Sequence, residues 1–213
     1  MSKVIAIDVL LVPDNGLLQR AKESNALLRQ NYAAGYSLDS DHTPHVTLLH
    51  RYIRAADLKE VSAAVSKVLV SQDARKLELT VSGYYSSPWG NRGLEVGALI
   101  VEVTPELRIL QQTIVDVVQP FAVSGGTADA FVPNTDRTPI DLDIIRHVEN
   151  FVPASSGEKY AAHVTVGLAN ANFLRELRSR PFNSFTFKPA GVAIFQLGGV
   201  GTARKNLWTS TPK

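Results

Sequence analysis

The chain has 213 residues, of which 45% are hydrophobic, enough to build one large domain or two small ones packed closely together. Its formal net charge of +2 comes from 22 basic and 20 acidic residues, so charge alone does not indicate a surface for nucleic acid or membrane. The sequence contains no cysteine, which excludes disulfides, thiol nucleophiles, iron–sulfur clusters and cysteine-ligated zinc.

The first residues form an apolar stretch from Lys3 to Val12 that is interrupted by Asp8 and ended by Pro13. This stretch has no small-residue cleavage site and predicts a strand rather than an export signal. No run in the sequence approaches the roughly 20 apolar residues of a membrane helix. We therefore expect no membrane contact and a cytoplasmic location.

The next elements alternate between helix and strand. Asp14 predicts the N-cap of a helix that continues through Tyr32, because leucine and alanine recur at helical spacing. A polar loop from Ser37 to Pro44 leads to a short strand that begins at His45. A second helix is predicted from Ala55 to Val70.

The middle of the chain predicts a hairpin and then a capped helix. Residues 76–85 and 94–103 are β-rich, and residues 86–93 between them indicate a long hairpin tip. Thr104, Pro105 and Glu106 have the composition of a helix start, and this helix should run to about Val118.

The last third begins with an irregular connection over residues 124–139, which we expect at the rim of the site, as we do the hairpin tip near Trp89. The remaining predicted elements are a helix over 141–151, a strand over 160–168, a helix over 171–179, and final strands over 184–187 and 192–197, the last continuing toward Trp208. No flexible linker interrupts the sequence, so we expect one domain spanning residues 1–213.

The most informative feature is a repeated tetrad. His45-Val46-Thr47-Leu48 recurs as His163-Val164-Thr165-Val166, 118 positions later (163 minus 45). Because strand side chains alternate, each His and Thr should share one face, while the apolar residues pack on the other. Two such strands related by a pseudo-twofold would place two imidazoles and two hydroxyls on opposite sides of one cleft.

This set of groups suits the cleavage of a phosphate ester without a metal ion. One imidazole can remove a proton from an attacking water, and the other can supply a proton to the leaving ribose oxygen. Threonine hydroxyls can donate to the non-bridging phosphoryl oxygens and stabilise the transition state. A histidine-ligated metal site is the weaker interpretation, because His-x-Thr lacks the helical His spacing and nearby carboxylate of common zinc motifs.

Other residues are secondary candidates. The alternation predicts that Arg51 shares the face of His45 and Thr47, where it would guide a phosphate. The remaining histidines, His42, His50 and His147, are expected to face solvent rather than take part in catalysis. Further side chains that could stack on a base or bind a phosphate are Tyr160, Tyr52, Trp89, Phe195, Arg204 and Lys205.

The tetrads, with Pro44 before the first and Gly167 after the second, resemble those of the two-histidine (2H) phosphoesterase superfamily, which includes 2',5' RNA ligase-like proteins and cyclic phosphodiesterases. The resemblance spans most of the chain. It implies a bilobal α+β fold with two related antiparallel sheets, helices outside and a central cleft. It also implies acid/base roles for His45 and His163 and phosphate binding by Thr47 and Thr165. Ala162 departs from the proline that often precedes this histidine.

The expected function is hydrolysis of a cyclic phosphodiester, such as a nucleoside or RNA-end 2',3'-cyclic phosphate, to a monoester. We expect no cofactor, no metal and no obligate protein partner. Cleavage or joining of 2',5' linkages in RNA is an alternative, and so is a non-catalytic module that binds a nucleotide or an RNA end. The sequence leaves open which histidine is the acid, which linkage opens and the oligomeric state.

Overall fold

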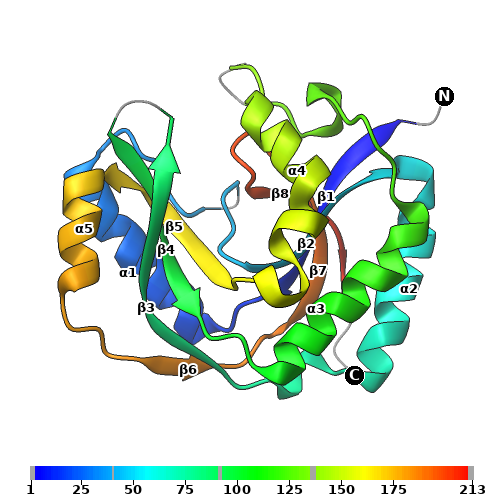
Figure 1. Ribbon diagram of the computed structural model, residues 1–213, viewed down its shortest axis with the longest axis horizontal. Coiled ribbons are helices and arrows are strands. Elements are labelled where there is room, and N and C mark those ends of the chain that lie inside the picture. The colour runs from blue at the N-terminus through cyan, green and yellow to red at the C-terminus, as the bar shows by residue number, and fades with distance from the viewer. Residues whose placement is uncertain (1–2, 40, 91–92, 135–137, 211–213) are drawn as a thin grey trace.

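The computed structural model describes residues 3–39, 41–90, 93–134 and 138–210. Among these residues, the strands β1 to β8 form two four-stranded antiparallel sheets, which lie on opposite sides of the molecule in Figure 1. Helices pack on the outer side of each sheet. This is an α+β fold of two antiparallel sheets, as the resemblance to the 2H phosphoesterases implied, and that prediction is confirmed.

The first sheet has the strand order β2-β1-β7-β8. Its central strand, β1 (Val4–Val12), lies between β2 (Val46–Arg54) and β7 (Gly191–Leu197), and β8 (Ala203–Thr209) forms one edge. All residues of β1 from Ile5 to Leu11 are buried, because protein covers both faces of the strand. Asp8 therefore lies in the middle of a strand that is otherwise apolar.

The second sheet has the order β5-β4-β3-β6, formed by β5 (His163–Asn170), β4 (Leu94–Val101), β3 (Leu79–Trp89) and β6 (Phe185–Phe187). Strand β3 continues four residues past its expected end at Tyr85, with Pro88 opposite Glu95. The proline is tolerated because β6 pairs with β3 only as far as Val81, so one edge of β3 is open near Pro88. Asn91 and Arg92 of the expected hairpin tip lie outside the described residues.

The two halves exchange helices. Helix α1 (Asn15–Asn31) follows β1 of the first sheet but packs against β5 of the second. Helix α3 (Pro105–Val118) follows β4 of the second sheet but packs against β2 of the first. In Figure 1, α1 and α5 (Ala171–Ser179) lie beside the second sheet, whereas α3 and α2 (Leu58–Ser71) lie beside the first.

The predicted helix starts at Asp14 and Thr104 are confirmed in detail, whereas the helix predicted from Ala55 begins at Leu58, after a 3₁₀ turn over Ala55–Asp57. Asp14 Oδ1 accepts a hydrogen bond from the backbone N–H of Leu17 at 2.8 Å, and Thr104 Oγ1 accepts one from Leu107 at 3.2 Å. Each cap satisfies one of the donors that a helix start leaves unpaired.

Other element boundaries were also predicted wrongly. Helix α4 (Leu142–Ser155) continues past its expected end at Phe151 and includes Pro153, because Val148 and Phe151 anchor it in the core. Strand β5 begins at His163 instead of Tyr160, because residues 157–159 form a short 3₁₀ turn. No helix in the described part of the chain has the length and apolar character that a bilayer crossing requires.

Candidate active site

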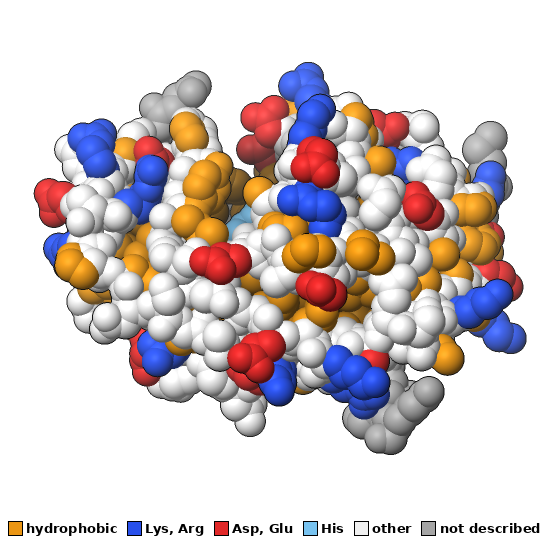
Figure 2. All heavy atoms as spheres, turned by 60° about the horizontal axis from the view of Figure 1, so that its bottom comes forward, with side chains coloured by type: hydrophobic (Ala, Val, Ile, Leu, Met, Phe, Trp, Pro, Cys, Tyr) orange, Lys and Arg blue, Asp and Glu red, His pale blue; other side chains and the backbone are white. Residues whose placement is uncertain are grey.

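A cleft of about 550 Å³ lies between the two sheets, within the usual size of small-molecule sites. Its walls come from β2, from β3, β4 and β5, from α4 and from the loop after α1. The chain has five histidines, and all of them line this cleft: His42, His45, His50, His147 and His163. Figure 2 shows the hollow with a histidine side chain inside it and hydrophobic side chains around it.

Each tetrad strand carries a β-bulge directly after its threonine. In the first sheet Thr47 pairs with Leu10 and Leu49 with Val9, so that Leu48 is the extra residue. In the second sheet Thr165 pairs with Ala98 and Gly167 with Gly97, so that Val166 is the extra residue. Because a bulge bends and twists the strand that carries it, both tetrad strands have a local distortion at the same place.

The carbonyl of each bulge residue is bound by a buried amide side chain. Gln111 Nε2, from α3, donates to Leu48 O at 3.1 Å. Asn25 Nδ2, from α1, donates to Val166 O at 2.8 Å. These two contacts use the exchanged helices, so each half supplies the amide that holds the other half's bulge. We call Gln111 and Asn25 the amide clamps.

The second bulge depends on a glycine. Gly167 has a φ of +139°, a conformation that residues with a side chain rarely adopt. A Cβ atom at this position would lie 2.8 Å from Asn25 Nδ2, too close for a normal contact. The absence of a side chain at Gly167 therefore allows both the backbone geometry and the clamp.

The two tetrad histidines are held by the same backbone contact. His45 Nδ1 lies 2.6 Å from Thr43 O, and His163 Nδ1 lies 2.9 Å from Ala161 O, a carbonyl two residues earlier in each case. Because a carbonyl only accepts hydrogen bonds, each Nδ1 carries a proton and donates. This leaves Nε2 as the nitrogen of each ring that is able to exchange a proton with a ligand.

The first tetrad has a partner that the sequence analysis missed. Asp8, which is fully buried, accepts a hydrogen bond from Thr47 Oγ1 at 3.1 Å, and its Oδ2 lies 3.0 Å from His45 Nε2. His50 Nε2 lies 3.3 Å from the same oxygen. Asp8 was visible in the sequence as the one charged residue of an apolar strand, and a buried carboxylate needs partners of this kind.

The expectation that His50 faces solvent was wrong. Its side chain is buried, and it packs against the rings of Phe151 at 4.9 Å and His147 at 5.4 Å between ring centroids. The bulge at Leu48 shifts the alternation by one residue, which turns His50 onto the face of Thr47. His50 also lies in the middle of β2, not at its end.

The same shift moves Arg51 away from the cleft. Arg51 pairs with Ile7, on the opposite face of the sheet from Asp8, and its Nη2 donates to Gln119 Oε1 at 2.8 Å near the end of α3. The structure therefore does not bring Arg51 to the tetrads. Its predicted place on the face of Thr47 was wrong because the alternation does not persist through the bulge.

Register comparison identifies the counterpart of Asp8. Three residues after Thr47, His50 pairs with Asp8, and three residues after Thr165, Leu168 pairs with Val96. The two half-sites thus have the same backbone pairing but differ in the side chains of this pair. The pair is Asp8 and His50 in the first half and the apolar Val96 and Leu168 in the second. All of these residues except Asp8 line the cleft.

The electrostatic environments of the two tetrad histidines differ accordingly. Burial acts to lower the pKa of His45, but the charge of Asp8 and its hydrogen bond outweigh burial and raise the pKa above its usual range. The pKa of His163 is lowered, because desolvation by the cleft, together with nearby His45 and His50, outweighs the hydrogen bond to Ala161 O, although the residue still has exposed surface. Desolvation within the cleft, together with nearby His50 and His163, also lowers the pKa of His147 to about 4, although this residue too has exposed surface.

Aromatic and aliphatic side chains dominate the remaining walls. Three large hydrophobic residues with exposed surface line this cleft: Tyr85 at 46% exposure, Ile100 at 37% and Val200 at 36%. Tyr85 lies 6.4 Å from His163 between ring centroids, and Trp89 also lines the wall. Exposed apolar groups gathered in one hollow indicate a ligand with an apolar part.

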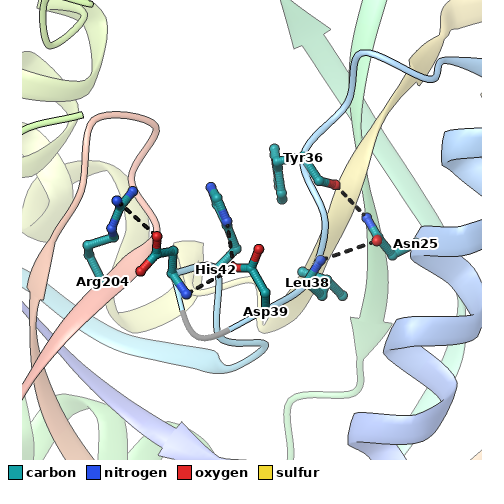
Figure 3. A network of polar contacts seen from close by, with 7 residues as sticks. Asn25, Tyr36, Leu38, Asp39, His42 and Arg204 are labelled. Atoms are coloured by element: carbon teal, nitrogen blue, oxygen red, sulfur yellow. Dashed lines mark hydrogen bonds and ion pairs between the residues drawn. The ribbon is translucent and has the colours of Figure 1, made fainter. Parts of the chain in front are cut away.

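The loop after α1 contributes Tyr36, Leu38, His42 and Thr43 to the cleft wall, and Figure 3 shows the polar contacts that hold this loop. Asn25 Nδ2 also donates to Tyr36 O at 3.0 Å, and Asn25 Oδ1 accepts from the Leu38 N–H at 3.2 Å. Further along, His42 stacks on Tyr36 with centroids 4.7 Å apart and pairs with Asp39. The loop thus lies between α1 and the first sheet, and His42 is part of the cleft wall rather than a solvent-facing residue.

The secondary candidates are divided by the structure. Tyr160 lines the cleft, but it is buried and its hydroxyl donates to Thr47 O at 2.8 Å, so it supports the first tetrad. Tyr52 and Phe195 are buried in the core and do not line the cleft. Arg204 pairs with Asp41 in the loop of Figure 3.

The expected rim is confirmed only at Trp89. The cleft is not lined by any described residue of the connection over 124–134 and 138–139. Residues 135–137 of the same connection lie outside the described part of the chain. Within that described part there is no group of three or more His, Cys, Asp or Glu side chains arranged to hold a metal ion.

Neither a family model nor a curated protein matches the sequence. The crystal structure of TT0787 of Thermus thermophilus matches with 14% identity, 96% coverage of each chain and a TM-score of 0.53. Apo E. coli LigT matches with 14% identity over 99% of this chain and 100% of its own, at 0.48. Kluyveromyces marxianus Usb1 matches with 11% identity over 97% and 98%, at 0.45. The likeness to TT0787 shows that this chain shares its fold.

Proposed function

We propose that the protein is a metal-independent phosphodiesterase that opens a cyclic phosphodiester of nucleotide size, such as a nucleoside 2',3'-cyclic phosphate, to a monoester. The observation that carries the proposal is the matched setting of His45 and His163. In both residues Nδ1 donates to a backbone carbonyl two positions earlier, and both residues line the same cleft. Each is also followed by a bulge that an amide clamp holds. The resemblance of the tetrads to those of 2H phosphoesterases supports the same reading.

In the proposed reaction, water attacks phosphorus and transfers a proton to the Nε2 of one histidine. The bond between phosphorus and the ribose oxygen breaks, and that oxygen receives a proton from the Nε2 of the other histidine. The two rings exchange protonation states, and solvent restores them. Thr165 is suited to orient a non-bridging oxygen, since its hydroxyl has no hydrogen-bond partner among the described residues and it lines the cleft.

The charge of the cleft favours a small substrate over a long RNA. Lys159 is the only lysine or arginine among the described residues that line the cleft, and its Nζ donates to Pro153 O at 2.9 Å. A polyanionic strand is normally bound along a track of cationic side chains. A cyclic phosphodiester has a single negative charge, and its base or sugar would contact the apolar wall near Tyr85 and Trp89.

The test is turnover of the four nucleoside 2',3'-cyclic monophosphates with EDTA present. Wild type is compared with His45→Ala, His163→Ala and, as a control on the outer side of α3, Gln112→Ala. Monoester release should persist in the chelator and in the control, and it should fall by about 10²- to 10⁴-fold in each histidine variant.

Other outcomes would redirect the assignment. Loss of activity in EDTA would contradict the metal-independent mechanism. Activity on 2',5'-linked oligonucleotides without activity on mononucleotides would favour the RNA phosphodiesterase or ligase alternative. Tight nucleotide binding with no turnover of any of these substrates would favour a binding module.

A further inference from the structure

The donors of the first tetrad are already occupied by a group within the protein. Asp8 Oδ2 lies 3.0 Å from His45 Nε2 and accepts from Thr47 Oγ1 at 3.1 Å. At the equivalent position of the second half stands Val96, which has no charge and no acceptor. An internal carboxylate therefore distinguishes two tetrads that share the His-Val-Thr residues and the bulge that follows the threonine.

Hydrogen bonding constrains the protonation state of each ring. His45 Nδ1 lies against the carbonyl of Thr43 and Nε2 against the carboxylate of Asp8, and neither acceptor has a proton to donate. Both nitrogens of His45 must therefore carry protons, which makes the ring an imidazolium. His163 has such an acceptor only at Nδ1 among the described residues, the carbonyl of Ala161, so hydrogen bonding places a proton at Nδ1 and requires none at Nε2.

The carboxylate of Asp8 is ionised in this setting. Burial acts to raise its pKa, but His50 and His45 outweigh burial and hold the pKa well below its usual range. The pKa of His45 is raised and the pKa of His163 is lowered, in agreement with the assignment from hydrogen bonds.

We propose that Asp8 is a positioning residue that keeps His45 protonated, so that His45 is the acid of the pair and His163 is the base. The chemical roles rest on the proposed function, whereas the charge states belong to the free protein. In the reaction, His163 Nε2 takes the proton of the attacking water. The Nε2 proton of His45, which Asp8 Oδ2 accepts in the free protein, passes to the leaving oxygen once the substrate replaces that contact. The lone pair that remains on His45 then faces a carboxylate, which favours uptake of a new proton from solvent.

The other titratable groups around Asp8 and His45 come from three elements. His50 on β2 lies 3.3 Å from the carboxylate, and His163 is on β5. His147 on α4 has a pKa of about 4 and is neutral at pH 7. Tyr160, whose pKa is raised by burial and by Asp8, is neutral as well. His50 is the group whose contribution must be separated from that of Asp8 by experiment.

The closing experiment follows the five histidine rings by ¹⁵N NMR as a function of pH in the full chain. Single His→Gln variants assign the signals, and the set comprises wild type, Asp8→Asn, His50→Gln and the surface control Asp116→Asn. In wild type at pH 7, His45 should have both nitrogens protonated and His163 should be the neutral Nδ1–H tautomer. In Asp8→Asn, the midpoint for His45 should fall by about 1 pH unit or more, with a smaller change for His163.

The second readout is the pH profile of kcat/KM on the best cyclic phosphate. Its basic limb should move to lower pH in Asp8→Asn and stay in place in Asp116→Asn. A neutral His45 in wild type at pH 7, which needs no variant to observe, would overturn the assignment. The assignment would also be overturned if the titration midpoint of His45 did not change in folded Asp8→Asn. The same holds if that midpoint changed in His50→Gln and not in Asp8→Asn. Absence of turnover with the expected NMR result would count against the proposed function while supporting the charge assignment.

Discussion

Asp8 faces His50 across β1 and β2 at the position where Val96 faces Leu168 across β4 and β5. Around this one pair the two half-sites resemble each other: each has a His-Val-Thr sequence, a bulge after the threonine and an amide clamp from an exchanged helix. A duplicated backbone thus provides symmetric positions, and a single buried charge is enough to make them chemically unequal. Acid/base catalysis needs this inequality, because one ring must begin protonated and the other neutral.

The largest expected effect comes from truncating the two equivalent residues. Asp8→Ala removes the acceptor of His45 and Thr47 from a fully buried site and should lower the free energy of unfolding by about 3–5 kcal/mol. Val96→Ala removes part of a half-buried apolar side chain and should cost about 1 kcal/mol. Urea unfolding at pH 6 measures both. Equal losses would mean that the carboxylate has no special structural importance.

The amide clamps offer a test of what the halves share. Gln111→Ala and Asn25→Ala each leave a buried bulge carbonyl unpaired and should each cost about 1–3 kcal/mol. Asn25→Ala should be the more harmful, because Asn25 also binds the backbone of Tyr36 and Leu38. The neighbouring Gln112→Ala, whose amide contacts only exposed Asp116 among the described residues, should change stability by less than about 0.5 kcal/mol. Thermal and urea unfolding would reveal a clamp that is dispensable.

The threonines should differ in the kind of effect they produce. Thr165→Val removes a hydroxyl with no protein partner among the described residues, so it should lower kcat/KM by about 10-fold or more and leave stability nearly unchanged. Thr47→Val removes a donor to Asp8 and should reduce stability by about 1 kcal/mol. Steady-state kinetics combined with unfolding curves separates the two cases. Matching losses of kcat/KM without any loss of stability would indicate equivalent threonines.

The ion pair between Asp8 and His45 should also make the stability depend on pH. Because the folded pKa of Asp8 is lowered from 3.8, its contribution is present above pH 3.8 and is lost as the pH falls toward the folded value. Because the folded pKa of His45 is raised from 6.5, its contribution is present below pH 6.5 and is lost as the pH rises through the folded value. The difference in stability between wild type and Asp8→Asn should therefore be largest between pH 3.8 and 6.5. A difference that keeps growing above pH 7 would contradict the ion pair.

The sequence predicted the parts of the site that depend on local pattern. The tetrads, the helix caps at Asp14 and Thr104 and the two antiparallel sheets follow from alternation, capping chemistry and the family resemblance. A glycine inside a predicted strand, Gly167, was a sign in the sequence of the second bulge, and the structure gives it a φ of +139°.

The errors came from one long-range irregularity. The first bulge contains only Leu48 and Leu49, without a glycine or proline to mark it, so strict alternation wrongly placed Arg51 on the cleft face and left His50 out. The importance of Asp8 depends on partners about forty positions away in the sequence, and these become neighbours only when β1 and β2 pair.

The exchange of α1 and α3 has a consequence for how the protein folds. The Asn25 clamp joins residues 141 positions apart, the Tyr160 contact to Thr47 joins residues 113 apart, and the Gln111 clamp joins residues 63 apart. Contacts of such high sequence separation slow folding, because the entropic cost of closing a long loop comes before the contact can stabilise the chain. During synthesis, the face of α1 that covers β5 must wait for most of the chain to emerge. A correctly bound ligand in the cleft would therefore report that the whole topology has been completed.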